Sequence, residues 1–327
     1  MSRIDKPRTQ HQNTDKSRLL EQLDEDIQEL NQLKQKIKQL EEEKQLKEQQ
    51  LEQLDTTSAQ VPSVMFNTTY REYRQYDLAY NRVKEFYKEQ HRYQTVAYNI
   101  QARINFKTKV RDKMTIWDAL LKLNHLLDES DPDTELSQIE HAFQTAEAIR
   151  KDNKPRWFQL VGLIHDLGKL LYFYESKGQW DVVGDTFPVG CRYSTKIIHH
   201  EFFKDNPDYK NPLYNTKYGI YSPHCGLENV MLSWGHDEYM YHLAKEQSRL
   251  PPQALAMIRY HSFYPWHQEG AYKYLMNKKD EEMLKAVKEF NPYDLYSKTD
   301  VKCNLEEVKD YYIELIDEFF PKKVIDF

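Results

Sequence analysis

Beyond Met65, the apolar residues of this 327-residue chain recur at helical spacing almost throughout. Over 115–127 a single apolar stripe is formed by Ile116, Leu120, Leu123 and Leu127. The same periodicity predicts helices over 77–106, 137–150, 156–174, 192–203, 236–249, 252–262, 279–290 and 304–319. No two alternating β-branched runs are joined by an Asn-Gly or Asp-Gly turn. The sequence therefore predicts an all-α fold, with loops at 129–135, 176–190 and 205–226 that have room for functional residues.

The N-terminal part of the chain differs in character from the rest. Residues 1–16 are polar, and we expect them to be disordered. Between Arg18 and Asp55 there is no Gly or Pro, and the apolar residues follow a 3-4 repeat that weakens after about two heptads. We therefore predict that residues 1–60 form a disordered start and a coiled-coil-like helical extension. This extension either pairs, with itself or with a partner through residues 18–55, or stays a solvated single helix.

Charge and composition exclude several classes of function. The net charge is −6 and the basic residues are interspersed with acidic ones, so we expect no nucleic-acid partner. No stretch is apolar enough to span a bilayer, and the N-terminus lacks the apolar segment of a secretion signal. The cysteines, Cys191, Cys225 and Cys303, form no CxxC pair, and their odd number argues against a disulfide framework. We predict a cytoplasmic protein with no membrane partner.

A histidine and an aspartate, His165 and Asp166, stand in the middle of an apolar helical pattern. An ionised aspartate among Leu, Ile and Val is costly unless it is paired or bound to a metal. Gly162 and Gly168 flank the pair, although a glycine costs about 1 kcal/mol against alanine inside a helix, so another group is expected to approach closely. Lys169 falls four residues after His165, on the same helical face. A packed histidine beside an aspartate paired with Lys or Arg would explain the dipeptide alone, but this setting favours a metal.

Other predicted helices supply further ligands for a metal. His141 lies early on the helix before His165, and the two converge if these helices form a hairpin. His236 begins a later helix, His261 ends the next one, and Asp294 lies in an aromatic-rich context that buries its carboxylate. For each of these histidines taken alone, a core histidine with satisfied hydrogen bonds is the better explanation.

Several sequence strings resemble known families. His-Asp-Leu-Gly-Lys at 165–169 resembles the signature of the metal-dependent HD-domain superfamily. More specific are Asp-Glu-Ser-Asp-Pro-Asp (128–133), His-Ala-Phe-Gln-Thr-Ala-Glu (141–147), Val-Gly-Asp-Thr-Phe-Pro-Val-Gly-Cys (183–191), Ser-Trp-Gly-His-Asp-Glu-Tyr (233–239), Tyr-His-Ser-Phe-Tyr-Pro-Trp-His (260–267) and Asp-Leu-Tyr-Ser-Lys (294–298). Together they resemble the myo-inositol oxygenases over essentially all of residues 66–327, whereas residues 1–60 have no counterpart in the usual form of that family. The family's early Phe-Arg-Asn-Tyr-like motif reads Tyr-Arg-Glu-Tyr here, around Arg71.

The resemblance implies that residues 61–327 are an HD-domain-like diiron oxygenase domain. It would bind two iron ions as a mixed-valent Fe(II)/Fe(III) pair, use O2 as co-substrate, and cleave the ring of myo-inositol to D-glucuronate. With Asp166 as the bridge, the implied metal ligands are His141, His165, Asp166, His236, His261 and Asp294. The implied substrate contacts are Arg71, Asp128, Ser130, Lys169, Gly184, Asp185, His261, Ser262 and Lys298. Among these, Lys169 and Lys298 would be catalytic, because their charges ease the deprotonation of a bound hydroxyl.

Two functions from other classes remain as alternatives. An HD-type metal-dependent phosphohydrolase would share the ligands His141, His165, Asp166 and Asp294 in type and order, but it would need a basic phosphate pocket. A coiled-coil interaction protein with an inactive helical domain would have a broken ligand set, and all six implied positions are occupied. Without the resemblance, ordinary turns would be the better explanation of the Asp128–Ser130 and Gly184–Asp185 segments.

Overall fold

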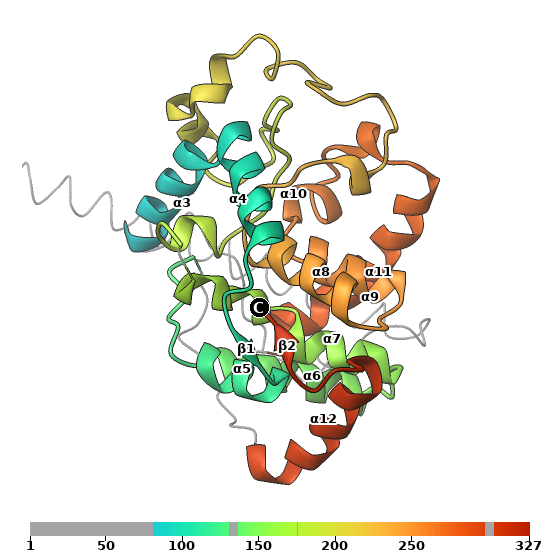
Figure 1. The fold of residues 1–327 in the computed structure, drawn as a ribbon. Coiled ribbons are helices and arrows are strands. Elements are labelled where there is room, and N and C mark those ends of the chain that lie inside the picture. Colours follow the sequence, from blue (N-terminus) through green and yellow to red (C-terminus); the bar gives the residue numbers. More distant parts are fainter. Residues whose placement is uncertain (1–80, 131–136, 175, 298–303) are drawn as a thin grey trace, which may run out of the picture. The chain divides into compact units, whose positions relative to one another are not determined.

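The computed structural model describes residues 81–130, 137–174, 176–297 and 304–327 (Figure 1). Its α-helices are α3 (Asn81–Tyr93), α4 (Val96–Thr108), α5 (Ile116–Leu123), α6 (Gln138–Lys151), α7 (Arg156–Ile164), α8 (His236–Gln247), α9 (Pro252–Tyr260), α10 (Tyr264–His267), α11 (Lys278–Tyr296) and α12 (Leu305–Phe319). Its 3-10 helices are η2 (Leu167–Phe173), η3 (Gln179–Asp181), η4 (His200–Asp205), η5 (Pro207–Lys210), η6 (Leu227–Asn229) and η7 (Lys273–Leu275). A short antiparallel pair joins β1 (Lys113–Met114) to β2 (Ile325–Asp326). For this part of the chain the prediction of an all-α fold is confirmed.

Several predictions fall on residues that the structure does not describe. These are the disordered start and the coiled-coil-like extension within residues 1–60, together with Arg71 and Lys298. The predicted boundary at residue 61 therefore stays a prediction. Within the described ranges, no helix is both long enough and apolar enough to pass through a membrane.

Short polar side chains fix where several helices begin. Thr95, Thr115 and Ser137 precede α4, α5 and α6, and each hydroxyl accepts a hydrogen bond from a backbone N–H in the first turn. At the start of α11, Asn277 and Asp280 form the reciprocal hydrogen bonds of a capping box. These caps satisfy N–H groups that a helix otherwise leaves without partners. They explain why the helices predicted to begin near 115, 137 and 279 do begin there.

Three predicted helices differ from the structure, and two of them lie outside the His165–Asp166 segment. The segment 77–106 is not continuous, because the helix ends at Tyr93 and Thr95 caps a second one. The segment 192–203 is turns followed by η4, so the predicted α-helix is wrong. His199 there has a φ of 49°, a left-handed conformation that an α-helix cannot accommodate. Tyr193, Ile197 and Phe203 of this segment pack in a separate cluster with Phe187 instead.

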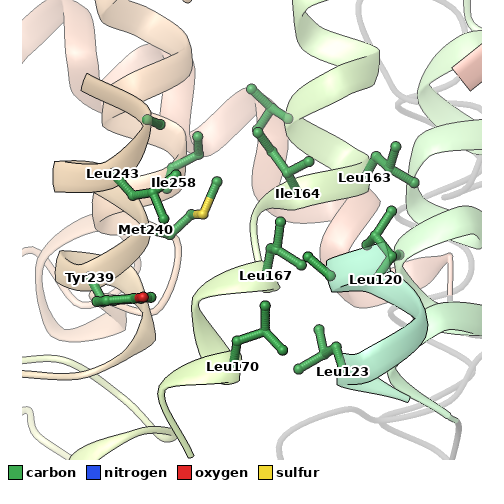
Figure 2. Close-up of a cluster of buried hydrophobic side chains, with 14 of the residues drawn as sticks. Leu120, Leu123, Leu163, Ile164, Leu167, Leu170, Tyr239, Met240, Leu243 and Ile258 are labelled. Carbon is green, nitrogen blue, oxygen red and sulfur yellow. The ribbon is translucent and has the colours of Figure 1, made fainter. Parts of the chain in front are cut away.

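The predicted helix 156–174 is also interrupted, and the break is where His165 and Asp166 lie. The α-helix α7 ends at Ile164, and η2 continues the chain in 3-10 geometry. Figure 2 shows the side chains that hold this turn: Leu167 and Leu170 of η2 lie between two flanking groups, Leu120 and Leu123 of α5 and Tyr239, Met240 and Leu243 of α8. The tight 3-10 turn therefore lies deep in the apolar core of the described domain.

Gly168 explains how η2 and α8 come so close. A Cβ atom at Gly168 would lie 2.1 Å from the backbone oxygen of His236, so only a glycine fits there. The expectation that another group approaches this glycine is confirmed, and the group is the first residue of α8.

Replacing Gly168 by alanine is expected to destabilise the protein by about 1–3 kcal/mol, the usual cost of forcing extra atoms into a packed core. Urea unfolding measures the change. The matched control is Gly235→Ala, whose added Cβ would lie 3.1 Å from the Val182 oxygen and which should cost less. Equal stability of the Gly168→Ala variant and the wild type would contradict the close approach.

Candidate metal centre

The first group of candidate ligands comes from α6, the end of α7, and α11. Nε2 of His141 lies 3.1 Å from Oδ1 of Asp294, and Nε2 of His165 lies 3.4 Å from the same oxygen. Oδ2 of Asp166 lies 3.7 Å from the first of these nitrogens and 3.6 Å from the second. None of the four residues is more than 8% exposed. Two imidazoles and two carboxylates thus converge on one buried point.

The second group lies on the other side of the same aspartate. Oδ1 of Asp166 is 3.4 Å from Nε2 of His236 and 3.5 Å from Nε2 of His261, and these two nitrogens are 3.3 Å apart. Ligand atoms about 2.1 Å from a common ion lie roughly 3.0–3.5 Å from one another. Because its two oxygens face different groups, Asp166 is positioned between two sites at which a metal ion can bind.

Backbone carbonyls decide which nitrogen of each imidazole carries the proton. Nδ1 lies 2.8–2.9 Å from a carbonyl oxygen in His165, His236 and His261. The accepting oxygens are those of Gly162, Val182 and Ile258 respectively. A carbonyl only accepts, so each Nδ1 is the donor and each Nε2 presents its lone pair to the centre. This is how proteins hold histidine as a metal ligand, and the donor set therefore fits a pair of transition-metal ions.

The charges around the first group keep its carboxylates ionised. Burial alone would raise the pKa of Asp166, but the Lys169 ammonium and the neighbouring imidazoles hold that pKa well below its ordinary value. For Asp294, contacts with His141 and His165 outweigh burial in the same direction. The pKa of His141 is lowered, chiefly by burial. Anionic oxygens therefore face a neutral imidazole, which is the combination that binds a cation.

A further carboxylate, that of Asp237, lies at the second group. It is completely buried, with Oδ1 2.7 Å from Nε2 of His236 and 3.4 Å from Nε2 of His261. Despite burial, Asp237 and Asp166 raise the pKa of His261 to about 9, so this position favours a positive charge. The hydroxyl and the backbone N–H of Ser262 both donate to this carboxylate. The sequence does not single out Asp237, because an acidic residue in the first turn of a helix is common on protein surfaces.

Lys169 connects the centre to Asp128. Its Nζ lies 2.8 Å from Oδ2 of Asp128, 2.9 Å from Oδ2 of Asp166 and 3.2 Å from Oε1 of Gln138. The 3-10 helix η2 has about three residues per turn, so Lys169 stands over Asp166, three residues earlier, whereas the α-helical spacing predicts that it shares a face with His165, four residues earlier. Oδ1 of Asp128 accepts from the backbone N–H and the hydroxyl of Ser130, at 2.8 and 2.6 Å. Although burial favours the neutral amine, the two carboxylates raise the pKa of Lys169.

The loop with Gly184 and Asp185 lies next to Ser262. The N–H of Thr186 donates to the carbonyl oxygen of Ser262 at 3.0 Å, and the Tyr87 hydroxyl lies 3.4 Å from Oδ1 of Asp185. Gly184 has a φ of 89°, which favours glycine at this turn. The structure thus joins this loop to Ser262 through a backbone hydrogen bond.

Comparison with known proteins gives a consistent set of matches. The family described as Myo-inositol oxygenase matches residues 80–327. The chain is 51% identical to Inositol oxygenase 1 of Arabidopsis thaliana over 286 residues, which cover 85% of this chain and 91% of that protein. It is 47% identical to Inositol oxygenase of Dictyostelium discoideum, with 77% and 89% of the two chains covered. For Inositol oxygenase of Rattus norvegicus the identity is 48%, with 74% and 85% covered.

Proposed function

Because this chain belongs to the myo-inositol oxygenase family, we propose that it uses O2 to open the ring of myo-inositol and form D-glucuronate. The observation that carries this proposal is the pair of buried ligand groups on either side of Asp166. A mononuclear enzyme would not need a carboxylate that offers one oxygen to each of two groups. The names of the plant, animal and Dictyostelium relatives support the same activity.

We propose that the centre holds two iron ions, in the mixed-valent Fe(II)/Fe(III) state. Their ligands would be His141, His165 and Asp294 for the first ion, His236 and His261 for the second, and Asp166 for both. Imidazole and carboxylate donors with open coordination positions suit non-haem iron. The bound ions would supply a Lewis acid for a substrate hydroxyl and the capacity to react with O2.

The protein side chains have a separate task, which is to bind and orient a hexahydroxy ring. Asp128 and Asp166 keep Lys169 charged, so its ammonium can ease the loss of a substrate hydroxyl proton, and the N–H donor that now faces Oε1 of Gln138 would turn to that hydroxyl. The Ser262 hydroxyl donates to Asp237. The lone pairs of the Ser262 oxygen can therefore accept a hydrogen bond from a substrate hydroxyl. Each hydroxyl buried without a partner costs about 1–3 kcal/mol, so more contacts are needed. We propose them for Arg71, Asp128, Ser130, Gly184, Asp185, His261 and Lys298.

The phosphohydrolase alternative has less support from this geometry. A phosphate group needs cationic partners that are not already neutralised. Lys169, the cation that the described residues bring to the centre, is matched by two carboxylates, Asp128 and Asp166. We therefore retain the oxygenase as the single proposed function.

Oxygen uptake is the direct test of this function. Iron-loaded protein given myo-inositol in air-saturated buffer is expected to consume one O2 for each inositol and to yield D-glucuronate and water. The metal-free protein and protein given no inositol are the controls. Hydrolysis of a phosphate ester by the metal-loaded protein, without oxygen uptake on inositol, would overturn the proposal in favour of the alternative.

We propose that the predicted extension over residues 18–55 is an accessory that catalysis does not need. All six proposed ligands lie beyond residue 140, and every proposed substrate contact except Arg71 lies beyond residue 127. A protein that begins near Val61 is expected to keep its iron and its rate, and to lose at most an association that light scattering detects. A folded truncated protein that has lost its activity would show instead that the extension contributes to the site.

We also propose that the protein works in the cytoplasm. Its cysteines form no CxxC pair, which suits a reducing compartment. Immunofluorescence of the untagged protein tests this, and its recovery in a secreted fraction would contradict it.

A further inference from the structure

Two buried glutamines, Gln90 and Gln94, lie one turn apart, at and just beyond the end of α3. Gln94 is completely buried and Gln90 is 2% exposed. Buried amides are costly unless their groups are hydrogen-bonded. Both side chains donate to backbone oxygens of segments far away in the sequence, close to the metal centre.

Gln94 holds Trp234 by both of its backbone groups. Nε2 of Gln94 donates to the Trp234 carbonyl oxygen at 2.7 Å, and Oε1 accepts from the Trp234 N–H at 3.1 Å. Nε2 also donates to the carbonyl oxygen of Trp180 at 3.3 Å, and Oε1 accepts from Nδ2 of Asn99 at 2.9 Å. Both donors and both lone pairs of the amide are used, so the orientation of this side chain is fixed.

A second contact joins Val182 to His236, which lie two residues after Trp180 and Trp234 respectively. The carbonyl oxygen of Val182 accepts from the backbone N–H of His236 at 2.7 Å and from its Nδ1 at 2.8 Å. Trp180 precedes Val182, and Trp234 precedes His236. Gln94 therefore closes a ring of contacts through Trp180, Val182, His236 and Trp234. That ring sets where the Nε2 lone pair of His236 is directed.

Gln90 is hydrogen-bonded to a different segment, the loop around Gly184. Its Nε2 donates to the carbonyl oxygens of Val183 and Asp185, at 3.1 Å each. These residues flank Gly184 on the loop that we assign to substrate. The two glutamines therefore share side-chain type and burial, but they hold different parts of the site, and Gln90 makes fewer hydrogen bonds than Gln94.

We propose that Gln94 is a positioning residue for His236 and thereby sets the affinity of the second metal position. The inference rests on the proposed metal centre. Residues that orient a metal ligand typically change metal affinity by about 10- to 100-fold. Gln94 acts one step further out, through the backbone at Val182 and Trp234, so its loss should weaken the second position by about 10-fold.

The test compares Gln94→Met with Gln90→Met, since methionine keeps the length of the side chain and removes the hydrogen bonds. Each metal-free protein is titrated with Co(II), whose visible spectrum reports on the ligands around the ion. Wild type and Gln90→Met are expected to bind two ions alike. Gln94→Met should bind the second about 10-fold more weakly, with an altered spectrum for that ion. Gln90→Met should instead raise the KM for myo-inositol.

Unchanged binding of both ions by a folded Gln94→Met variant would overturn the proposal, and so would an equal loss of affinity in the two variants. Should Gln94→Met not fold, Gln94→Glu serves in its place, because it retains the acceptor for the Trp234 N–H but loses the donor to the carbonyl. A smaller weakening of the second ion alone is then expected, and no weakening would overturn the proposal. If wild type binds two Co(II) but its iron form consumes no oxygen with inositol, the proposed function fails while the role of Gln94 stands.

Discussion

Asp166→Ala is expected to abolish ring cleavage and to leave the purified protein with at most one metal ion. The physical reason is that Asp166 offers Oδ2 to His141 and His165 and Oδ1 to His236 and His261, so its removal takes a ligand from both groups. Elemental analysis of iron and oxygen uptake on myo-inositol measure the two losses.

Asp294→Ala is the matched control, because among the proposed ligands within the described residues Asp294 contacts only His141 and His165. This variant should retain the ion of the second group while losing that of the first. An Asp166→Ala protein that keeps two irons and turns over normally would contradict the proposal that Asp166 is a ligand of both ions.

Lys169→Met is expected to lower kcat/KM by about 100-fold or more, the usual effect of removing a donor that stabilises developing negative charge. It should also reduce the free energy of unfolding by about 3–5 kcal/mol, because Asp128 and Asp166 are left buried without their cation. Steady-state kinetics and urea unfolding measure the two effects. Kinetics are recorded at a temperature where the variant is fully folded, so that the two stay separate.

The same substitution at Lys154 provides the comparison. Lys154 lies 2.8 Å from Glu289, but this pair is partly exposed, and such pairs contribute about 0–1 kcal/mol. Lys154→Met should therefore change neither stability nor kinetics much. If folded Lys169→Met protein unfolds early but keeps near-normal kcat/KM, Lys169 is an ion-pair partner and does not act on substrate.

The convergence of His141 and His165 is the part of the site that sequence reasoning predicts best. It requires two helices to pack closely, and small residues make that approach feasible. A Cβ at Gly162 would lie 2.9 Å from Cα of Ala146, so α6 and α7 touch where both side chains are small. The imidazole rings consequently lie 5.2 Å apart. The periodicity and the glycine are both visible in the sequence, and the structure adds the cap at Ser137.

Other features of the site could not be predicted from the sequence, because the groups that they contact come from distant segments. A polar residue at a helix end, such as Gln94 or Asp237, is most often exposed to solvent. Periodicity cannot show that a distant backbone segment or a metal ligand buries it. The 3-10 geometry of η2 places Lys169 over Asp166, and apolar spacing does not separate a period of three from one of 3.6 over so short a segment. The left-handed His199 likewise prevents the α-helix that the residue types alone favour over 192–203.

The buried charges around the centre bear on how the protein matures. The described residues bring together the carboxylates of Asp128, Asp166 and Asp294, whose pKa values are lowered, with the ammonium of Lys169, a surplus of two negative charges. Such a surplus is very unfavourable away from water, so ion capture and the last stage of folding are expected to be one event. Iron starvation of a cell would then deplete the polypeptide itself, through proteolysis of ion-free chains, and not merely leave an idle enzyme.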